Sequence, residues 1–217
     1  MAEWAGIIVA ILLGLAGIFE VKNWFFKPRL RISIDLTPPD CHMIPLTKKE
    51  TGEVIDNVYY LRFCINNTGN REARDVQIMA TELYGSDNGE YKKVDSFLPL
   101  NLVWSHMHEM TTMENRMTMK TIPAGVFHHC DLGYLTHNRW KDKLLSAYPL
   151  KQQAEVILKM DTIVEPNTGS HIVFPGKYRL TIHVSASNAK MLRKVYQIEI
   201  KNIWSELGKN MIDIKET

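Results

Sequence analysis

The sequence has few cysteines, and their number is odd. Cys41, Cys64 and Cys130 are the three cysteines among 217 residues. This number excludes a small disulfide-stapled scaffold and is usual for a reducing compartment. Charge of one sign is also lacking, because 26 basic and 24 acidic residues leave a formal net charge of +2. Nucleic-acid binders concentrate basic residues on one face, so no nucleic-acid partner is expected.

The motifs of the common enzyme classes are also missing. The sequence contains no glycine-rich phosphate loop, no dinucleotide fingerprint, no nucleophile-elbow motif and no Cys-x-x-Cys pair. His108-Glu109 begins like the helix motif of zinc proteases, but Thr112 stands where the second histidine is required. We therefore expect a protein that is not an enzyme and that has no cofactor.

An apolar run without charges lies near the start of the chain. It extends from Trp4 to Phe19, and a helix from Trp4 to Trp24 would be about 31 Å long, close to the thickness of a bilayer's hydrocarbon core. A cleaved signal peptide would carry a basic start and a small-residue cleavage site, and neither is found here. We predict a single transmembrane α-helix that contacts lipid through residues 4–26, within an anchor of residues 1–27.

The charges that flank this run predict its orientation. Lys22, Lys27, Arg29 and Arg31 all follow the run, and basic flanks stay on the cytoplasmic side. We therefore predict a single-pass protein of the cell inner membrane, with its N-terminus outside and a domain of residues 28–217 in the cytoplasm.

Small residues recur along one face of the predicted helix. Gly6, Ala10 and Gly14 are spaced four residues apart, which places them in one stripe. Such a stripe permits close approach of two membrane helices. The sequence therefore raises the hypothesis of a homo-oligomer that forms through this helix.

From Arg29 onward the hydrophobic pattern changes to a period of two. Alternating or β-branched segments occur at Asn57–Asn66, Asp75–Tyr84, Gln153–Met160 and Tyr178–Ser185. About eight such segments follow one another without long helices between them, which predicts an all-β antiparallel sandwich.

Two motifs in this part of the chain carry a resemblance. One is Asn67-Thr68-Gly69 followed by Ala73-Arg74-Asp75-Val76, and the other is Pro175-Gly176-Lys177-Tyr178-Arg179-Leu180. They resemble the turn and the entry to a late strand in bacterial adhesion-related (CARDB-like) sandwiches. The resemblance implies an immunoglobulin-like fold, with Tyr178 in contact with upstream backbone. It implies no activity.

The sequence His128-His129-Cys130-Asp131 groups residue types that bind metals. Alternate side chains of a strand point to opposite faces, so His128 and Cys130 are separated from His129 and Asp131. Zinc requires three or four convergent ligands. We therefore expect no metal site, but a partly buried His-Cys pair and a solvated His-Asp pair.

The segment between Pro99 and Pro123 is long and rich in methionine. Leu100, Leu102 and Trp104 alternate, which predicts that Trp104 lies in the core. Methionine adapts to varied binding surfaces, so we predict contacts to an unknown protein partner or small ligand through His106, Met107, His108, Met110 and Met113. Two alternatives remain open, namely that the methionines cover the edge of the sandwich, or that methionine and histidine bind copper(I).

These observations favour a non-catalytic, membrane-tethered binding, scaffolding or sensing module at the inner face of the membrane. The alternative is an extracytoplasmic sandwich that handles copper through residues 106–119.

Overall fold

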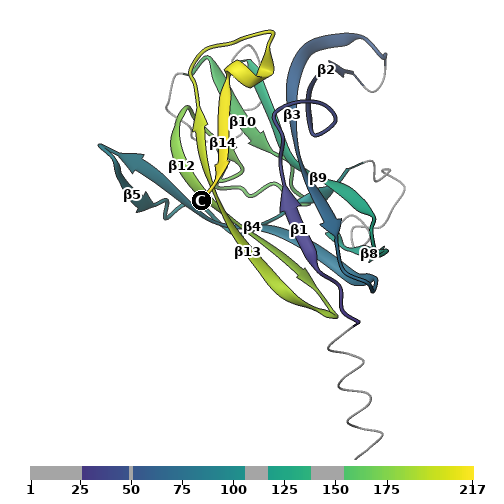
Figure 1. Cartoon of the computed structure of the whole chain (residues 1–217). Helices are drawn as coiled ribbons and strands as arrows, with labels where there is room; N and C mark the ends of the chain where they lie inside the picture. The colour runs from purple at the N-terminus through teal and green to yellow at the C-terminus, as the bar shows by residue number, and fades with distance from the viewer. Residues whose placement is uncertain (1–25, 49–50, 106–116, 138–153) are drawn as a thin grey trace, which may run out of the picture.

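The structure is a computed structural model that describes residues 26–48, 51–105, 117–137 and 154–217 (Figure 1). Within these ranges the named elements are β-strands and one 3-10 turn, η2 (Gly208–Asn210). The strands are β1 (Leu30–Ser33), β2 (Cys41–Thr47), β3 (Val54–Asn67), β4 (Ala73–Asp87), β5 (Glu90–Lys93), β6 (Leu100–Asn101), β7 (Val103–Trp104), β8 (Met119–Ile122), β9 (Phe127–His137), β10 (Val156–Met160), β11 (Ile172–Val173), β12 (Gly176–Ala186), β13 (Ala189–Ile200) and β14 (Ile212–Glu216).

The strands form two antiparallel sheets (Figure 1). The first sheet has the order β1-β3-β9-β10-β11, with β2 beside β3 and β7 beside β9. The second has the order β14-β13-β12-β4-β5, with β6 and β8 beside β4. The all-β, antiparallel sandwich expected from the sequence is confirmed at this level.

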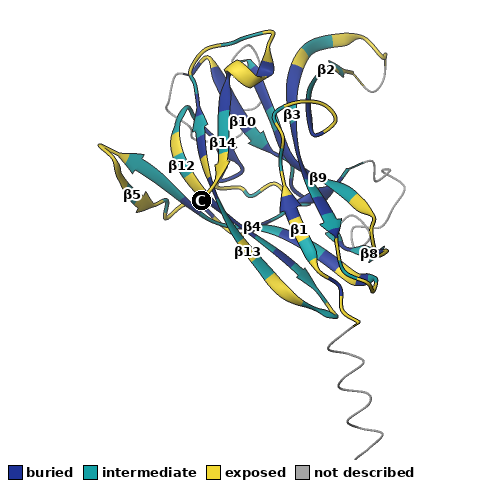
Figure 2. Ribbon diagram, viewed as in Figure 1, coloured by how far each residue is buried: buried dark blue, intermediate teal, exposed yellow. Residues whose placement is uncertain are grey.

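A single main core lies between the sheets (Figure 2). The alternation that predicts strands also determines this core, because Leu180, Ile182 and Val184 of β12 are all buried. The ring of Phe63 in the first sheet lies 5.1 Å from that of Tyr196 in the second, measured between centroids. Trp104 is fully buried, as its alternation with Leu102 predicts.

Tyr178 is the residue for which the resemblance implies contact with upstream backbone. It lies in β12, and its ring packs against the core. A tyrosine that bonds the backbone of an upstream segment is Tyr59, whose hydroxyl donates to the Leu36 carbonyl oxygen at 2.6 Å. This bond holds the chain that follows β1 against β3.

The predicted anchor lies almost entirely outside the described residues. Residues 1–25, with Gly6, Ala10 and Gly14, belong to the part about which the structure makes no statement. Over 26–48, 51–105, 117–137 and 154–217, no helix has the length and apolar composition that crossing a membrane requires.

Candidate functional site

The outer face of the first sheet carries several ionisable side chains. Along β9 the side chains alternate, so that Cys130 is in the core while His129 faces outward. The register places Cys64 of β3 opposite His129, and Ser33 of β1 opposite Cys64. Directly opposed residues have neighbouring β-carbons, so three adjacent strands form one row of side chains on this face.

The loop between β1 and β2 places Asp40 against this row. One carboxylate oxygen of Asp40, Oδ2, accepts a hydrogen bond from the Asp35 N–H at 3.0 Å. The buried guanidinium of Arg62 donates through Nε to the Asp40 carbonyl oxygen at 3.4 Å and through Nη2 to the Pro39 carbonyl oxygen. A cation from the sheet therefore holds the backbone of the loop and fixes the position of the Asp40 side chain.

Asp40, Cys64 and His129 meet at this point, and we call them the Asp40–Cys64–His129 cluster. The second carboxylate oxygen of Asp40, Oδ1, lies 2.9 Å from His129 Nε2. One potential ligand atom from each of the three residues lies within 4.8 Å of the others. The Asp40 and His129 side chains are 12% and 13% exposed, so the cluster is largely sheltered but reachable from solvent.

The Cys64 thiol in this cluster is not an activated nucleophile. Burial raises the pKa of Cys64, the negative charge of Asp40 adds to this effect, and a hydrogen bond with Ser33 opposes it. The thiolate is the reactive form of cysteine, so Cys64 is protonated at neutral pH when no cation is present.

A second polar group, centred on Tyr60, lies further along the same face. The Tyr60 hydroxyl donates to Asp161 Oδ2 at 2.8 Å, and its ring stacks on Tyr134 with centroids 5.9 Å apart. Asp131 accepts a hydrogen bond from the Ser105 hydroxyl. Burial raises the pKa of Asp131 to about 7. The carboxyl groups of Asp131 and Asp161 and the phenol of Tyr60 therefore form one polar group that is partly shielded from water.

The polar character continues onto β10 and β11. Lys159 opposes Tyr134 in the register and forms an ion pair with Glu165 at 2.5 Å. His171 is fully buried, and its Nε2 lies 3.8 Å from the Glu165 carboxylate. Burial lowers the pKa of His171 below its usual value, so this ring is neutral near pH 7.

The structure both supports and corrects the interpretation of residues 128–131. Cys130 and His129 do face opposite sides of the sheet, as the strand period predicts. The expected solvated His-Asp pair was wrong, because Asp131 is only 7% exposed. Asp131 accepts a hydrogen bond from Ser105, while His129 contacts Asp40. Asp131 is buried because β7 and Tyr60 lie against it.

The sequence reasoning missed Asp40 and Cys64 altogether. Both are distant from His129 in the chain, and only the register of β3 with β9 and the loop after β1 bring them together. A signal was present in the outward positions of β3, where Tyr60 and Cys64 stand in place of the charged residues that a solvated face favours.

The five predicted contact residues lie outside the described residues. His106, Met107, His108, Met110 and Met113 all belong to the undescribed segment 106–116. The residue that precedes them is placed, since Ser105 bonds Asp131 through its hydroxyl and His129 through its N–H, the latter at 3.0 Å. Ser105 therefore lies on the polar face. Met119, which the alternative of copper binding through residues 106–119 includes, packs against the core.

A different arrangement holds the start of the domain. The buried side chain of Asn67 accepts hydrogen bonds through Oδ1 from the N–H groups of Arg29 and Gly69, both at 3.1 Å. Its Nδ2 donates to the carbonyl oxygens of Arg71, at 2.7 Å, and Ile122, at 3.0 Å. The Lys27 N–H donates to Asn70 Oδ1 at 3.1 Å. We call this contact between residues 27–29 and 67–70 the clasp.

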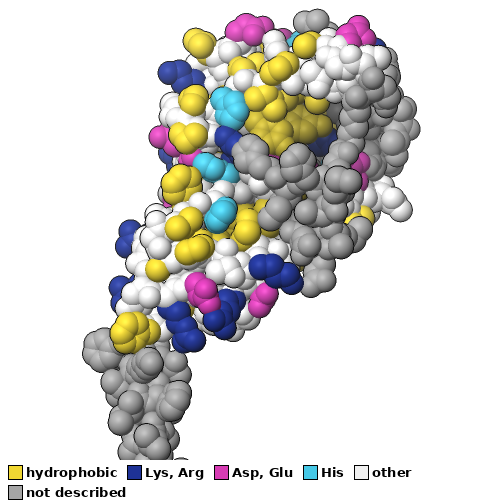
Figure 3. Space-filling view, turned by 90° about the vertical axis from the view of Figure 1, so that its right-hand side faces the viewer, with side chains coloured by type: hydrophobic (Ala, Val, Ile, Leu, Met, Phe, Trp, Pro, Cys, Tyr) yellow, Lys and Arg dark blue, Asp and Glu magenta, His cyan; other side chains and the backbone are white. Residues whose placement is uncertain are grey.

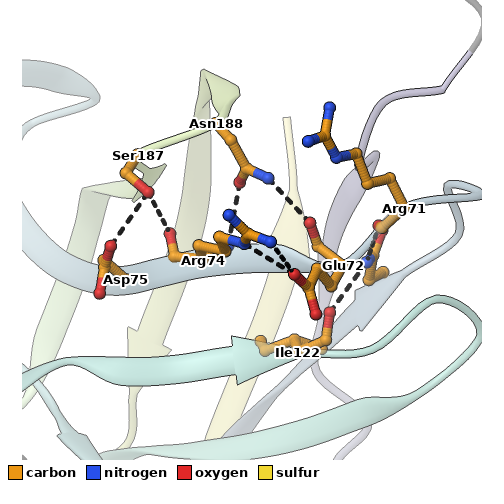
Figure 4. A network of polar contacts seen from close by, with 8 residues as sticks. Arg71, Glu72, Arg74, Asp75, Ile122, Ser187 and Asn188 are labelled. Atoms are coloured by element: carbon orange, nitrogen blue, oxygen red, sulfur yellow. Dashed lines mark hydrogen bonds and ion pairs between the residues drawn. The ribbon is translucent and has the colours of Figure 1, made fainter. Parts of the chain in front are cut away.

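The β12–β13 turn is fastened at the same end of the sandwich (Figure 4). Asn188 accepts a hydrogen bond from the Arg74 N–H at 3.0 Å and donates to the Glu72 carbonyl oxygen at 2.9 Å. Ser187 donates to Asp75 Oδ2 at 3.1 Å. The turn and residues 27–30 also line a common surface hollow. The first strand, the clasp and this turn therefore form one surface.

Charge and apolar side chains gather at this end, as Figure 3 shows near the start of the described chain. On the same face that Figure 3 presents, histidine side chains lie beside a hollow with hydrophobic walls. The exposed basic residues of this end are Lys27, Arg29, Arg31, Arg71, Arg74 and Lys190. The exposed apolar ones are Phe26, Val126, Phe127 and Met191.

No protein-family model, curated protein or solved structure matches the chain. The fold and the site therefore define its class on their own: a two-sheet antiparallel sandwich with ionisable groups sheltered on the outer face of one sheet.

Proposed function

We propose that the chain is a non-catalytic binding, scaffolding or sensing module, tethered to the inner membrane with an immunoglobulin-like sandwich on the cytoplasmic side. The clasp is the observation that carries this proposal. Lys27 is already bonded to the domain through Asn70, and only Phe25 and Phe26 separate it from Trp24, the end of the predicted membrane helix. Three extended residues span at most about 11 Å, so the clasp end is held at the membrane surface.

The composition of the clasp end supports this position. Its basic residues are of the kind that anionic lipids of the cytoplasmic leaflet attract, at about 1 kcal/mol for each residue near the surface. Phe26 and Met191 are about half exposed, and apolar and aromatic side chains of this kind favour the interfacial region of a bilayer. Charge and hydrophobicity thus favour the same surface as the clasp.

The polar outer face of the first sheet is the proposed binding surface. The segment with Met107, Met110 and Met113 follows Ser105, which lies on this face beside Asp131. Methionine-rich segments adapt to a protein or a small ligand. A non-catalytic role agrees with the thiols, since burial raises the pKa of Cys41 to about 12 and that of Cys130 well above its usual value.

Photo-crosslinking in intact membranes tests both parts of the proposal. A photoreactive residue at Met110 should give a discrete adduct with a protein or small molecule, and one at Met191 should label lipid. The same residue at Lys215, which is exposed on β14 of the second sheet, is the matched control and should give neither product. Equal labelling at all three positions, or an absence of lipid adducts at Met191, would contradict the proposal.

A further inference from the structure

We infer that the Asp40–Cys64–His129 cluster is a binding site for a divalent transition metal of the zinc type. The inference does not rest on the proposed function. A carboxylate, a thiolate and an imidazole are the three ligand types that zinc takes in proteins, and here they come from three different parts of the chain.

The distances are close to those that a zinc ion requires. Zinc–nitrogen and zinc–oxygen bonds of about 2.1 Å at a tetrahedral angle place the two ligand atoms about 3.4 Å apart. The observed separation of His129 Nε2 and Asp40 Oδ1 is 2.9 Å, so these atoms need to separate by only a fraction of an ångström.

The sulfur atom needs to approach the other two ligand atoms by at most about 1.2 Å. A zinc–sulfur bond of about 2.3 Å places sulfur about 3.6 Å from each of the other ligand atoms, and the three atoms here lie within 4.8 Å of one another. Cys64 is intermediate in burial, so its side chain is not enclosed on every side. The ion would replace the direct hydrogen bond between Asp40 and His129.

The surrounding residues hold the ligands in place before a metal arrives. Asp35 engages Asp40 Oδ2, which leaves Oδ1 directed at His129. Arg62 fixes the backbone of the loop through the carbonyl oxygens of Pro39 and Asp40. Such supporting contacts orient the ligands of natural metal sites and influence their affinity.

The site has three protein ligands and remains reachable from solvent. Zinc sites of this kind keep a fourth position for water or for a group from another molecule. The cluster therefore suits reversible binding, in which the occupied site exposes one coordination position on the outer face of the first sheet.

Cobalt(II) substitution in the full chain tests the inference. The chain is purified in mild detergent under reducing conditions, stripped with a chelator and titrated with Co²⁺. A thiolate-to-cobalt charge-transfer band should grow to saturation at one equivalent, and Zn²⁺ should then abolish it. Cys64→Ser should remove the band, and His129→Ala should weaken binding by at least about 10-fold.

The neighbouring residues supply matched controls. His128→Ala and Cys130→Ala alter the same strand but no member of the cluster, and both should retain the band and the affinity. Near-ultraviolet circular dichroism checks that each variant is folded. If Cys64→Ser does not fold, Asp40→Asn replaces it, because the amide keeps an acceptor for Asp35 and should still lower Zn²⁺ affinity by at least about 10-fold.

Two results would overturn the inference. One is a wild-type chain that gives no saturable charge-transfer band with Co²⁺. The other is a band that persists in the folded Cys64→Ser variant, which would assign the thiolate to another cysteine.

Discussion

Replacing Asn67 with alanine should open the clasp and destabilise the domain. The Asn67 side chain makes four hydrogen bonds, with the N–H groups of Arg29 and Gly69 and the carbonyl oxygens of Arg71 and Ile122. Alanine offers none of them. The N–H of Arg29 would then lose the bond that ties the segment after the predicted anchor to the end of β3.

The magnitude follows from the burial of each bond. Three of the four are part-buried, so water partly replaces them and their combined loss is about 2 kcal/mol. The bond to the Ile122 carbonyl oxygen is buried, and a buried acceptor without a partner costs about 1–3 kcal/mol. We therefore expect Asn67→Ala to lower the free energy of unfolding by about 3–5 kcal/mol.

Urea unfolding of the full chain in mild detergent, followed by tryptophan fluorescence, measures this loss. Asn66→Ala is the matched control, because the Asn66 Oδ1 atom is buried without a hydrogen-bond partner among the described residues, and it should cost less than about 1 kcal/mol. Trypsin should also cleave after Arg29 faster in Asn67→Ala. A loss below 1 kcal/mol, or equal losses in the two variants, would refute the reasoning.

Three further predictions concern the clasp, pH and assembly. Gly69→Ala should weaken the clasp, because a β-carbon would lie 2.4 Å from the Lys27 carbonyl oxygen, whereas Gly85→Ala meets only ordinary contacts at 3.7 Å and should be nearly neutral in the same unfolding assay. Burial lowers the pKa of His171 in the folded chain, so on acidification the unfolded chain binds a proton at this residue first. The free energy of unfolding should therefore fall as the pH decreases below about 6.5, and it should fall less steeply in His171→Gln. An equally steep fall would exclude His171 as the cause. If oligomers form through the helix stripe, replacing Gly6, Ala10 and Gly14 with leucine should reduce the yield of crosslinked oligomers in detergent. An unchanged yield would refute that contact.

The fold was largely predictable because the residues that form the core alternate along the strands. Leu180, Ile182 and Val184 illustrate this in β12, and Trp104 entered the core as its neighbours predict. The same period correctly separated His129 from Cys130. These predictions need only the local chain, since the two faces of a strand are set by its geometry.

The polar cluster could not be predicted in this way. Cys64 meets His129 through the register of β3 with β9, and Asp40 joins them because Arg62 and Asp35 hold its loop. These contacts depend on strand pairing and loop conformation, which a single sequence does not determine. The burial of Asp131 has the same origin, because Ser105 reaches it from β7.

The location of the sandwich relative to the membrane is the central claim, and reporter fusions after Thr217 test it most directly. Thr217 is exposed and directly follows β14, so a fusion there leaves the domain intact. One fusion carries a reporter that is active only in the cytoplasm, and the other a reporter that is active only outside it. The account predicts activity from the cytoplasmic reporter alone. Activity from the other reporter alone would contradict it and would favour the extracytoplasmic alternative.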